Sequence, residues 1–488
     1  MPPSFTTATI DIPTLIIAAL TLIAGGLLLW ALLRREHAPR PVAPGPPRTA
    51  EPVPLVLDAM ASLGAAMIDS SYPVGPTRRA LEEMAQNHGV RAAQAVIFPT
   101  SIMVSSGADD PAVSTDPAVS TEPAISAKSV QTRVVSAGDT SSLLYQIDAV
   151  DRIAGVARTR DSTAAGVMRA LGRLHTLPAP FSRPQRIAAY ALLSAALAVL
   201  LGSSWPGVAL AAALGVWVGA LLLMSDRLDT VRRALIVVAA ALSVGIIVLL
   251  VARYLDPGVL PAIIAPLVML LPGALLTIGV IELATGDIIS GAARVAAGAM
   301  RLLLLSAGLV AAGALVGVPA VATTAWPFGP IVPWVAVAAF GVGMGIYQCA
   351  RPASIGWIIV VLFVAYAAQV IGDVFFDGVL SALVGAAAMT PVAVVVGRLR
   401  TGPPAFVSFL PAFWLLVPGA LGLIGAAGVL EGDSSGMGTL ITTLATMVSV
   451  ALGVLIGLAT TGSVHGLRHA APDEWLRGQL DEEDAEPG

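Results

Sequence analysis

Four ionisable residues stand close together in an otherwise apolar part of the sequence. The stretch IELATGDIISGAARVAAGAMR, residues 281–301, holds Glu282, Asp287, Arg294 and Arg301. Asp287, Arg294 and Arg301 are spaced seven apart, so a helix would place them on one face. A charge beside long apolar segments is costly and usually faces a partner or an aqueous pathway. Two interpretations stay open: a carboxylate that carries a proton or holds a substrate ammonium group, and a structural ion pair.

A Pro-Gly pair occurs twice in the apolar part of the chain. LLPGALLTIG at residues 270–279 returns as LVPGALGLIG at 416–425, with seven of ten positions identical. Proline removes an amide donor and costs about 3 kcal/mol in a helix interior, while glycine lets the chain turn. Unpaired backbone groups are so costly in lipid that such a break persists only against protein or water. The two windows therefore predict two broken membrane helices.

A broken helix offers the N-terminus of its second half to a ligand. Its first amides have no helical partner and lie at the positive end of the helix dipole, which suits an anion such as an amino-acid carboxylate. Thr277, four residues past the first break, either contacts a polar substrate or bonds its own helix backbone. The plainer interpretation, that these prolines only kink their helices, explains one break more readily than a matched pair. The candidate substrate-binding residues are Pro272, Gly273, Ala274, Thr277, Pro418, Gly419 and Ala420.

The composition is that of a membrane protein. Hydrophobic residues make up 56% of the 488, charged residues only 12%, and the mean hydropathy is +0.84. Soluble domains carry about 25% charged residues. The net charge of −4 does not point to nucleic acid, and the single cysteine excludes an intrachain disulfide and a multi-thiolate metal site. No histidine lies in an apolar segment and no phosphate-binding loop is present, so we expect no metal and no cofactor.

Ten apolar segments follow Arg186, and arginines mark one side of them. Arginines precede the first segment and follow the even-numbered ones, whereas the opposite loops hold one arginine. Because positive residues favour the cytoplasm, both the region before the segments and the C-terminus are predicted to be cytoplasmic. The segments cover residues 187–203, 207–224, 234–252, 259–283, 292–317, 329–347, 354–372, 378–397, 405–430 and 437–461.

The two Pro-Gly pairs fall in the fourth and ninth of these ten segments. Five segments is an odd number, so corresponding helices of the two halves run in opposite directions. Two discontinuous helices related in this way are the pattern of an inverted-repeat transporter. We therefore predict an α-helical integral membrane protein whose ten-helix core forms two inverted five-helix repeats, residues 186–320 and 328–462. A cytoplasmic tail, 463–488, completes the chain.

An extra membrane helix is predicted near the N-terminus. The apolar run 12–33 is just long enough to span a bilayer, and its basic cluster follows it rather than preceding it. We interpret 1–35 as an uncleaved anchor and the proline-rich stretch 36–54 as an exposed linker.

Residues 55–180 are predicted to form a small cytoplasmic α/β domain. Helical patterns at its start and end flank three short strand patterns, AQAVIFP, IMVSSG and VQTRVVSAG. Between the last two lies DPAVSTDPAVSTEPAISA, a threefold hexamer that cannot bury a core, so 109–128 is predicted to be a disordered insertion. Ser101, Asp139 and His88 are available for hydrolysis, although no spacing links them.

With these residues in view, the chain resembles the threonine/serine exporter (ThrE) family over about 55–460. The resemblance rests on residues quoted at their positions in this sequence: GPTRRALEEMAQNHGV (75–90) with FPTSIMVS (98–105), TRVV (132–135) with DAVDRIAGVARTRDST (148–163), LPGALLTIGVIELATGDIISGAAR (271–294), and LPAFWLLVPGALGL (410–423). The last two stretches are specific together. The anchor and the hexamer insertion depart from the family core.

The resemblance implies a secondary carrier in a bacterial inner membrane that exports L-threonine and L-serine, driven by the proton-motive force, and not an enzyme. Its partners would be the lipid bilayer, a small amino acid and protons, with a homo-oligomer left open. Alternatives are a membrane-anchored hydrolase, a sensor on a helical scaffold, a channel, or an exporter of small peptides. Together with the charged run, the resemblance gives these proton-coupling or gating candidates: Glu282, Asp287, Ser290, Gly291, Arg294 and Arg301.

Overall fold

The chain divides into two compact units in the computed structural model. The helical unit contains the described residues of 12–35, 179–281 and 292–461, and the α/β unit contains those of 51–178 and 282–291. The structure describes residues 12–35, 51–107, 130–137, 142–159, 162–225, 228–255, 258–318, 328–376, 378–399, 401–416 and 419–461. Each unit is described by itself below.

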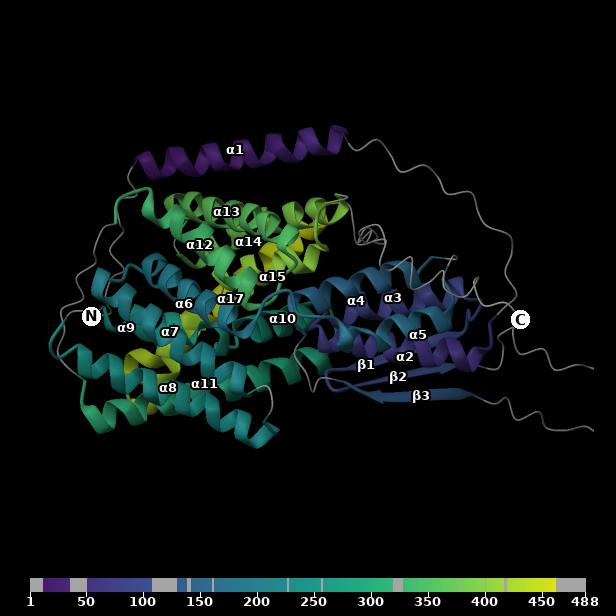
Figure 1. The fold of residues 1–488 in the computed structure, drawn as a ribbon, viewed down its shortest axis with the longest axis horizontal. Helices are drawn as coiled ribbons and strands as arrows, with labels where there is room; N and C mark the ends of the chain where they lie inside the picture. Colours follow the sequence, from purple (N-terminus) through teal and green to yellow (C-terminus); the bar gives the residue numbers. More distant parts are fainter. Residues whose placement is uncertain are drawn as a thin grey trace, which may run out of the picture. The chain divides into compact units, whose positions relative to one another are not determined.

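Helices make up the whole of the helical unit (Figure 1). Each of the ten predicted apolar ranges contains helix. The elements are α1 (Ile12–Arg35), α6 (Arg183–Leu200), α7 (Trp205–Ser225), α8 (Thr230–Val251), α9 (Val259–Ile264), the 3-10 helix η2 (Ala265–Leu270), α10 (Gly273–Ala284), α11 (Ile288–Val316), α12 (Val332–Tyr347), α13 (Pro352–Phe375), α14 (Gly378–Arg398), α15 (Ala405–Leu416), α16 (Gly419–Glu431) and α17 (Ser434–Thr460). Of these, the last residues of α10 and the first of α11 belong to the α/β unit.

Six helices among the described residues are long and apolar enough to cross a membrane, and counting each of two bent pairs as one span raises this to eight. Large apolar side chains such as Leu235, Met300 and Ile441 are exposed on these helices, as expected for side chains that face lipid. The chain is therefore an α-helical, multi-pass membrane protein. The six unbroken spans are α7, α8, α11, α13, α14 and α17.

Both predicted breaks coincide with bends. The pair formed by residues 259–270 and α10 bends by 62°, and α15 and α16 meet at 44°. In each pair the second helix begins at the glycine of the Pro-Gly sequence, Gly273 or Gly419. Pro272 is buried, while Pro418 lies outside the described residues. The first interruption is thus confirmed, and the second bend spans residues 417–418.

Close helix contacts in this unit depend on small residues. A Cβ placed on Gly453 of α17 would lie 2.4 Å from the Leu383 carbonyl oxygen of α14, and one on Gly343 of α12 would lie 2.8 Å from the Ala189 carbonyl oxygen of α6. Helix α1 packs against α13, where Ala18 joins Trp334 and Ala367 in a buried cluster. Without a hydrophobic drive between helices in lipid, such close backbone approach supplies much of the packing energy.

The α/β unit contains one antiparallel sheet with strand order β1-β2-β3. The strands are β1 (Ala93–Phe98), β2 (Ser101–Ser106) and β3 (Gln131–Ser136), in the three ranges predicted as strands. Helices α2 (Val53–Asp69) and α3 (Val74–Asn87) pack on the sheet, and α4 (Leu144–Ala157) and α5 (Ala164–Gly172) pack on α2 (Figure 1). The predicted insertion, 109–128, lies outside the described residues.

Local sequence explains the limits of these helices. Gly89 has φ +89° just after α3, the left-handed conformation expected of a glycine that stops a helix. Thr163 caps α5 through its hydroxyl oxygen, which accepts the Gly166 amide at 3.0 Å. Helix α2 begins at Val53, two residues before the predicted start of the domain at residue 55, because Pro54 suits the first turn of a helix.

Candidate functional site

The two helix breaks lie against each other inside the helical unit. A Cβ placed on Gly419, the first residue of α16, would lie 3.1 Å from the Leu271 Cβ atom. Leu271 immediately precedes the Pro272-Gly273 pair, so the N-terminus of α16 packs directly on the first break. Leu271, Pro272, Gly273 and Gly419 are all buried. The first residue of α16 is therefore in direct contact with the residue that precedes the first break.

The two half-helices that start at the breaks bury corresponding positions. Gly273 and Gly419 are buried, the next two residues of each helix are half-buried, and the following two are buried again. Ala274 and Ala420 are thus in equivalent, half-buried positions. The two windows with similar sequences therefore also have the same order of buried and half-buried residues.

The start of α10 has free backbone amides, as the sequence predicts for a helix that begins at the break. The Leu276 amide donates to the Pro272 carbonyl oxygen at 2.9 Å, which closes the first helical turn. Only the amides before Leu276 lack an intrahelical acceptor, as in any helix N-terminus. The amides that a ligand could reach at the first break are therefore those of the first three residues of α10, which begins at Gly273.

Thr277 is the polar side chain closest in sequence to the first break. It is 0% exposed, and its Oγ1 atom has no hydrogen-bond partner among the described residues. Of the two alternatives left open by the sequence, the bond from this hydroxyl to its own helix backbone is not made. Four residues separate Thr277 from Gly273, so both lie on the same face of α10. A buried, unpaired hydroxyl at this position is available to a polar ligand.

A tyrosine fastens the segment that precedes the first break. The Tyr190 hydroxyl, in α6, donates to the Pro266 carbonyl oxygen in η2 at 2.9 Å, and Tyr190 is fully buried. Its ring meets the Tyr347 ring edge-on, with centroids 4.6 Å apart, and packs on Gly219. The hydroxyl satisfies a carbonyl in a segment where regular α-helical bonding is lost, so η2 is tied to α6.

Glu282 and Asp287 flank the turn between α10 and α11, and both belong to the α/β unit. Gly286 has φ +93°, and the Asp287 amide donates to the Glu282 carbonyl oxygen at 2.9 Å. A glycine in the left-handed conformation, followed by an amide that bonds the carbonyl oxygen five residues earlier, is a common end of an α-helix. The turn therefore carries one carboxylate on each side.

Helix α3 of the same unit contacts both carboxylates. The Val74 amide donates to Glu282 Oε1 at 3.1 Å, and Glu282 is 1% exposed. Arg78 Nη2 lies 3.0 Å from Asp287 Oδ1 in an ion pair whose aspartate side chain is 13% exposed. These contacts match the ion-pair interpretation of the charged run, and α3 supplies one contact to each carboxylate.

The other members of the charged run differ in burial. Ser290 is buried and its Oγ atom has no hydrogen-bond partner among the described residues, while Gly291 begins the regular bonding of α11 by donating to the Asp287 carbonyl oxygen. Arg294 is 7% exposed. Arg301 is exposed, although it lies seven residues further along the same helix. The spacing of seven therefore does not give the three residues one environment.

Val74, Arg78 and Tyr190 were not singled out from the sequence. Arg78 had a weak signal, since it lies in the stretch 75–90 that carries the family resemblance, but nothing connected it to a residue 209 positions away. Val74 acts through its backbone amide, which no residue type reveals. Tyr190 has no distinguishing signal in the sequence, and only the folded chain shows that its hydroxyl bonds η2.

Two of the three residues considered for hydrolysis, Ser101 and His88, lie among the described residues. Ser101 begins β2, His88 follows the end of α3, and Asp139 lies outside the described residues. His88 instead contacts Ser162, with 3.3 Å between Nε2 and Oγ, and Glu51, with 3.4 Å between Nδ1 and Oε1. Serine, histidine and glutamate thus stand in the order of a catalytic triad.

Hydrogen bonding gives this group a structural role. The Ser162 hydroxyl donates to the Thr159 carbonyl oxygen at 3.1 Å, and His88 Nε2 also lies 3.2 Å from the Ala157 carbonyl oxygen at the end of α4. Both imidazole nitrogens thus face acceptor oxygens, and Ser162 is 3% exposed. The group joins the end of α3 to the end of α4 and leaves no accessible nucleophile.

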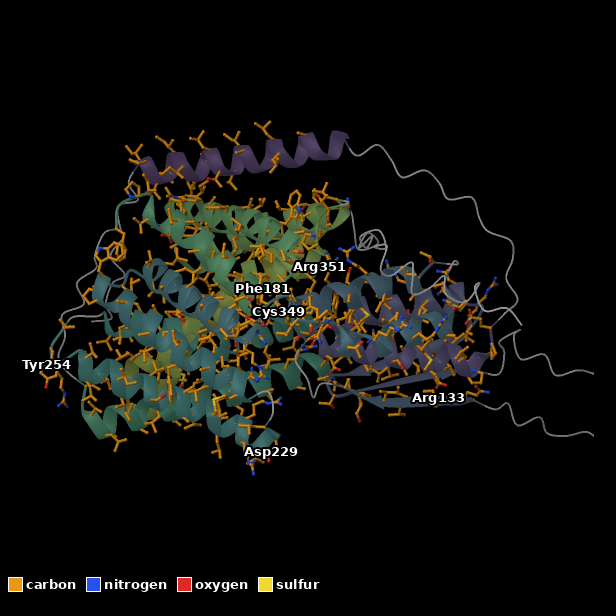
Figure 2. The ribbon with its side chains drawn as sticks, viewed as in Figure 1. Arg133, Phe181, Asp229, Tyr254, Cys349 and Arg351 are labelled. Atoms are coloured by element: carbon orange, nitrogen blue, oxygen red, sulfur yellow. The ribbon has the colours of Figure 1, made fainter. Side chains whose placement is uncertain are left out.

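No metal-binding group is found among the described residues: no three His, Cys, Asp or Glu side chains are arranged to hold an ion. The single cysteine, Cys349, is fully buried in the turn between α12 and α13, beside Phe181 (Figure 2). Burial raises the pKa of the Cys349 thiol more than the nearby Arg186 lowers it.

The fold defines an α-helical, multi-pass membrane protein with two bent helix pairs. The profile of the threonine/serine exporter family (ThrE) matches residues 58–316. That range covers more than half of the chain, and the protein belongs to this family of membrane exporters, which are not enzymes. No curated protein and no solved structure matches the chain.

The matched range has a structural meaning. It begins in α2 and ends at Val316, the last residue of α11. It therefore includes the first break, Thr277, both carboxylates and their α3 partners. The second break lies beyond it, and its assignment rests on the repeated sequence and on the contact between Gly419 and Leu271.

Proposed function

We propose that the protein is a secondary active transporter that exports L-threonine and L-serine by proton antiport with alternating access. The observation that carries this proposal is the buried contact between the two helix breaks, next to the unpaired Thr277 hydroxyl. Family membership supports the substrate class. Small peptides and related small amino acids remain the alternative cargo, since they would need similar polar groups.

The substrate would bind between the two half-helix N-termini. Its carboxylate would accept from the free amides at the start of α10 and α16, around Ala274 and Ala420, where the helix dipoles are positive. Its hydroxyl would bond Thr277. Discontinuous helices that present such termini near the bilayer midplane are the common design of inverted-repeat carriers.

Proton coupling would use Asp287 or Glu282. Protonation of Asp287 would remove its charge and so weaken its ion pair with Arg78. Proton binding would thereby be linked to the contact between α3 and the α10–α11 turn. The Glu282 carboxylate is more deeply buried, and its Oε1 atom accepts the Val74 amide. Ser290, Gly291 and Arg294 follow on the same segment and would shape the local path, with Arg301 further along α11.

The proposed topology places the α/β unit and the C-terminus in the cytoplasm of a bacterial inner membrane, with two inverted five-helix repeats forming the core. Positive residues on one side of the apolar segments support the orientation, and the matched bends at the fourth and ninth segments support the repeat.

The test is efflux of radiolabelled threonine and serine from proteoliposomes, with and without a pH gradient. Antiport predicts faster efflux when the pH gradient drives protons into the vesicles while the amino acid leaves them. External unlabelled amino acid should also accelerate efflux, because a carrier returns faster when loaded. Efflux that responds to neither condition would identify a passive channel, and absence of efflux for all amino acids tested would remove the proposed substrate class.

A further inference from the structure

Helices α8 and α11 pack closely in the helical unit. A Cβ placed on Gly308 of α11 would lie 2.8 Å from the Ala241 side chain of α8, and one placed on Gly245 of α8 would lie 2.7 Å from the Ala312 side chain of α11 (Figure 1). Between these two contacts, both helices advance by four residues in the same direction. The two helices therefore run parallel and begin on the same side of the membrane.

This register brings two arginines to the same level. Arg301 stands seven residues before Gly308, and Ala234 stands seven residues before Ala241, directly after Arg233. A spacing of seven is close to two helical turns, so Arg301 lies on the face of α11 that meets α8. The two positive charges are near enough to repel each other. Arg233 and Arg301 are called here the arginine pair.

The arginine pair lies at the edge of the hydrocarbon layer. Helix α8 has 22 residues and is about 33 Å long, compared with about 30 Å of hydrocarbon. Ala234, at the level of the pair, is four residues from the start of this helix. Both arginines are exposed, and the exposed apolar side chains of Leu235 and Met300 are close to them in the sequence. The pair therefore faces lipid at about the depth of the headgroups.

The charge of Arg301 has no acidic partner in the part of the chain that the structure describes. Asp229, just before α8, is engaged by Arg232, whose amide donates to Oδ1 at 2.9 Å and whose Nε atom lies 3.7 Å from Oδ2. Arg233 donates to the Leu228 carbonyl oxygen at 3.4 Å, and this bond to a neutral group leaves its charge in place. A cation this close to hydrocarbon is costly, so an anionic ligand would stabilise it.

We propose that the arginine pair binds the headgroup phosphate of an anionic phospholipid. Guanidinium groups present paired N–H donors that match phosphate oxygens, and basic residues between membrane helices recognise anionic headgroups. The apolar side chains of Leu235 and Met300 suit acyl chains, which a free phosphate ion lacks. This site goes beyond the proposed function, because it involves neither helix break and no transported amino acid.

The first measurement compares two lipids on the unmutated protein. Purified full-length protein in a nonionic detergent is titrated with phosphatidylglycerol, and the bound lipid is counted by native mass spectrometry. Phosphatidylcholine with the same acyl chains is the neutral comparison. Phosphatidylglycerol should bind at least about fivefold more tightly. Equal affinity for the two lipids would overturn the proposal, whatever any variant does.

The second measurement asks whether the arginine pair supplies the preference. Arg301→Gln should weaken phosphatidylglycerol binding at least about fivefold, while Arg301→Lys should keep most of the affinity because the charge is retained. Arg232→Gln is the matched control, since Arg232 is an exposed neighbour of Arg233 that is engaged by Asp229. Its affinity should stay near that of the parent. An equal loss in Arg232→Gln would show that only general surface charge matters and would overturn the site.

The third measurement asks whether both arginines hold one phosphate. If they do, Arg233→Gln should cost much less affinity in the Arg301→Gln background than in the parent protein. Losses that simply multiply would place the two arginines at separate sites and overturn the shared one. Inorganic phosphate, compared with chloride at equal ionic strength, should not displace the lipid. Displacement by inorganic phosphate would assign the pair to a free anion and overturn the lipid site.

Discussion

At the scale of single residues, the buried hydroxyl of Thr277 is the most informative group. A buried polar group without a hydrogen bond costs about 1–3 kcal/mol, so native proteins rarely keep one without a reason. Its position one turn after a helix break gives that reason, because a bound hydroxylated amino acid would supply the missing partner. Stability and function should then respond in opposite directions when this hydroxyl is removed.

Thr277→Val keeps the shape of the side chain and removes only the hydroxyl. We expect the melting temperature of the substrate-free protein to rise, because an unpaired buried group is lost. The half-saturation concentration for threonine and serine should increase about fivefold, which corresponds to roughly 1 kcal/mol for one neutral hydrogen bond. Transport kinetics and thermal unfolding of the same preparation measure both. Thr277→Ser, which retains a hydroxyl, should behave like the parent, and a lower melting temperature in Thr277→Val would contradict the assignment.

Cys349 offers a second test at this scale. Burial raises the pKa of its thiol, so less of it is thiolate at neutral pH than for an exposed cysteine. Maleimide labelling of the native protein should be slow and should accelerate as pH rises toward that raised pKa. Labelling in dodecyl sulfate should be fast and complete. Rapid labelling of the native protein at neutral pH would show that the turn between α12 and α13 is more open than described.

At the scale of elements, glycines set how closely the helices of the helical unit approach. Helices α14 and α17 meet where Gly453 faces the Leu383 carbonyl oxygen and the Ala386 side chain. The nearest atom is backbone, which cannot rotate away as a side-chain end can. An added methyl group must therefore separate the two helices.

Gly453→Ala should destabilise the protein by about 1–3 kcal/mol, the usual cost of overpacking. Gly438→Ala is the matched control in the same helix, since a Cβ there meets no atom within 4 Å. Thermal unfolding in detergent should show a lower midpoint for the first variant only. Equal midpoints for both would mean that the α14–α17 contact is looser than the described packing.

At the scale of the whole molecule, one helix links the two units. Helix α10 begins at the buried break and ends at a turn whose carboxylates are held by α3. In the proposed mechanism, a proton taken up by Asp287 would act on the ion pair with Arg78. Proton coupling and substrate exchange should therefore be separable by one substitution.

Asp287→Asn removes the negative charge of the carboxylate and keeps the size of the side chain. We expect it to lose efflux driven by a pH gradient while it retains exchange of labelled for unlabelled threonine, since exchange needs no proton transfer. Proteoliposome assays of both reactions provide the measurement, with Glu282→Gln as the comparison. Gradient-driven efflux that is unchanged in both variants would remove these carboxylates from the coupling mechanism.

The parts of the fold that could be predicted were those fixed by local chemistry. Apolar length marked the helices, the Pro-Gly pairs marked the bends, and period-two patterns marked the three strands. The bends were predicted from the Pro-Gly pairs, while the roles of Thr277, Glu282 and Asp287 stay predictions. The α3 partners of the two carboxylates were not predicted, because Val74 acts through a backbone amide and Arg78 is one of 26 arginines in the sequence.

The sequence by itself determined that this chain is a membrane protein, at which residues its helices bend, and to which family it belongs. Hydropathy, proline geometry and motifs are properties of residues that are neighbours in the sequence. Only the tertiary structure decided that Gly419 packs on Leu271, that the Thr277 hydroxyl is left unpaired, and that α3 holds the two carboxylates. Those facts depend on contacts between residues more than a hundred positions apart, and packing of the folded chain, not local preference, selects them.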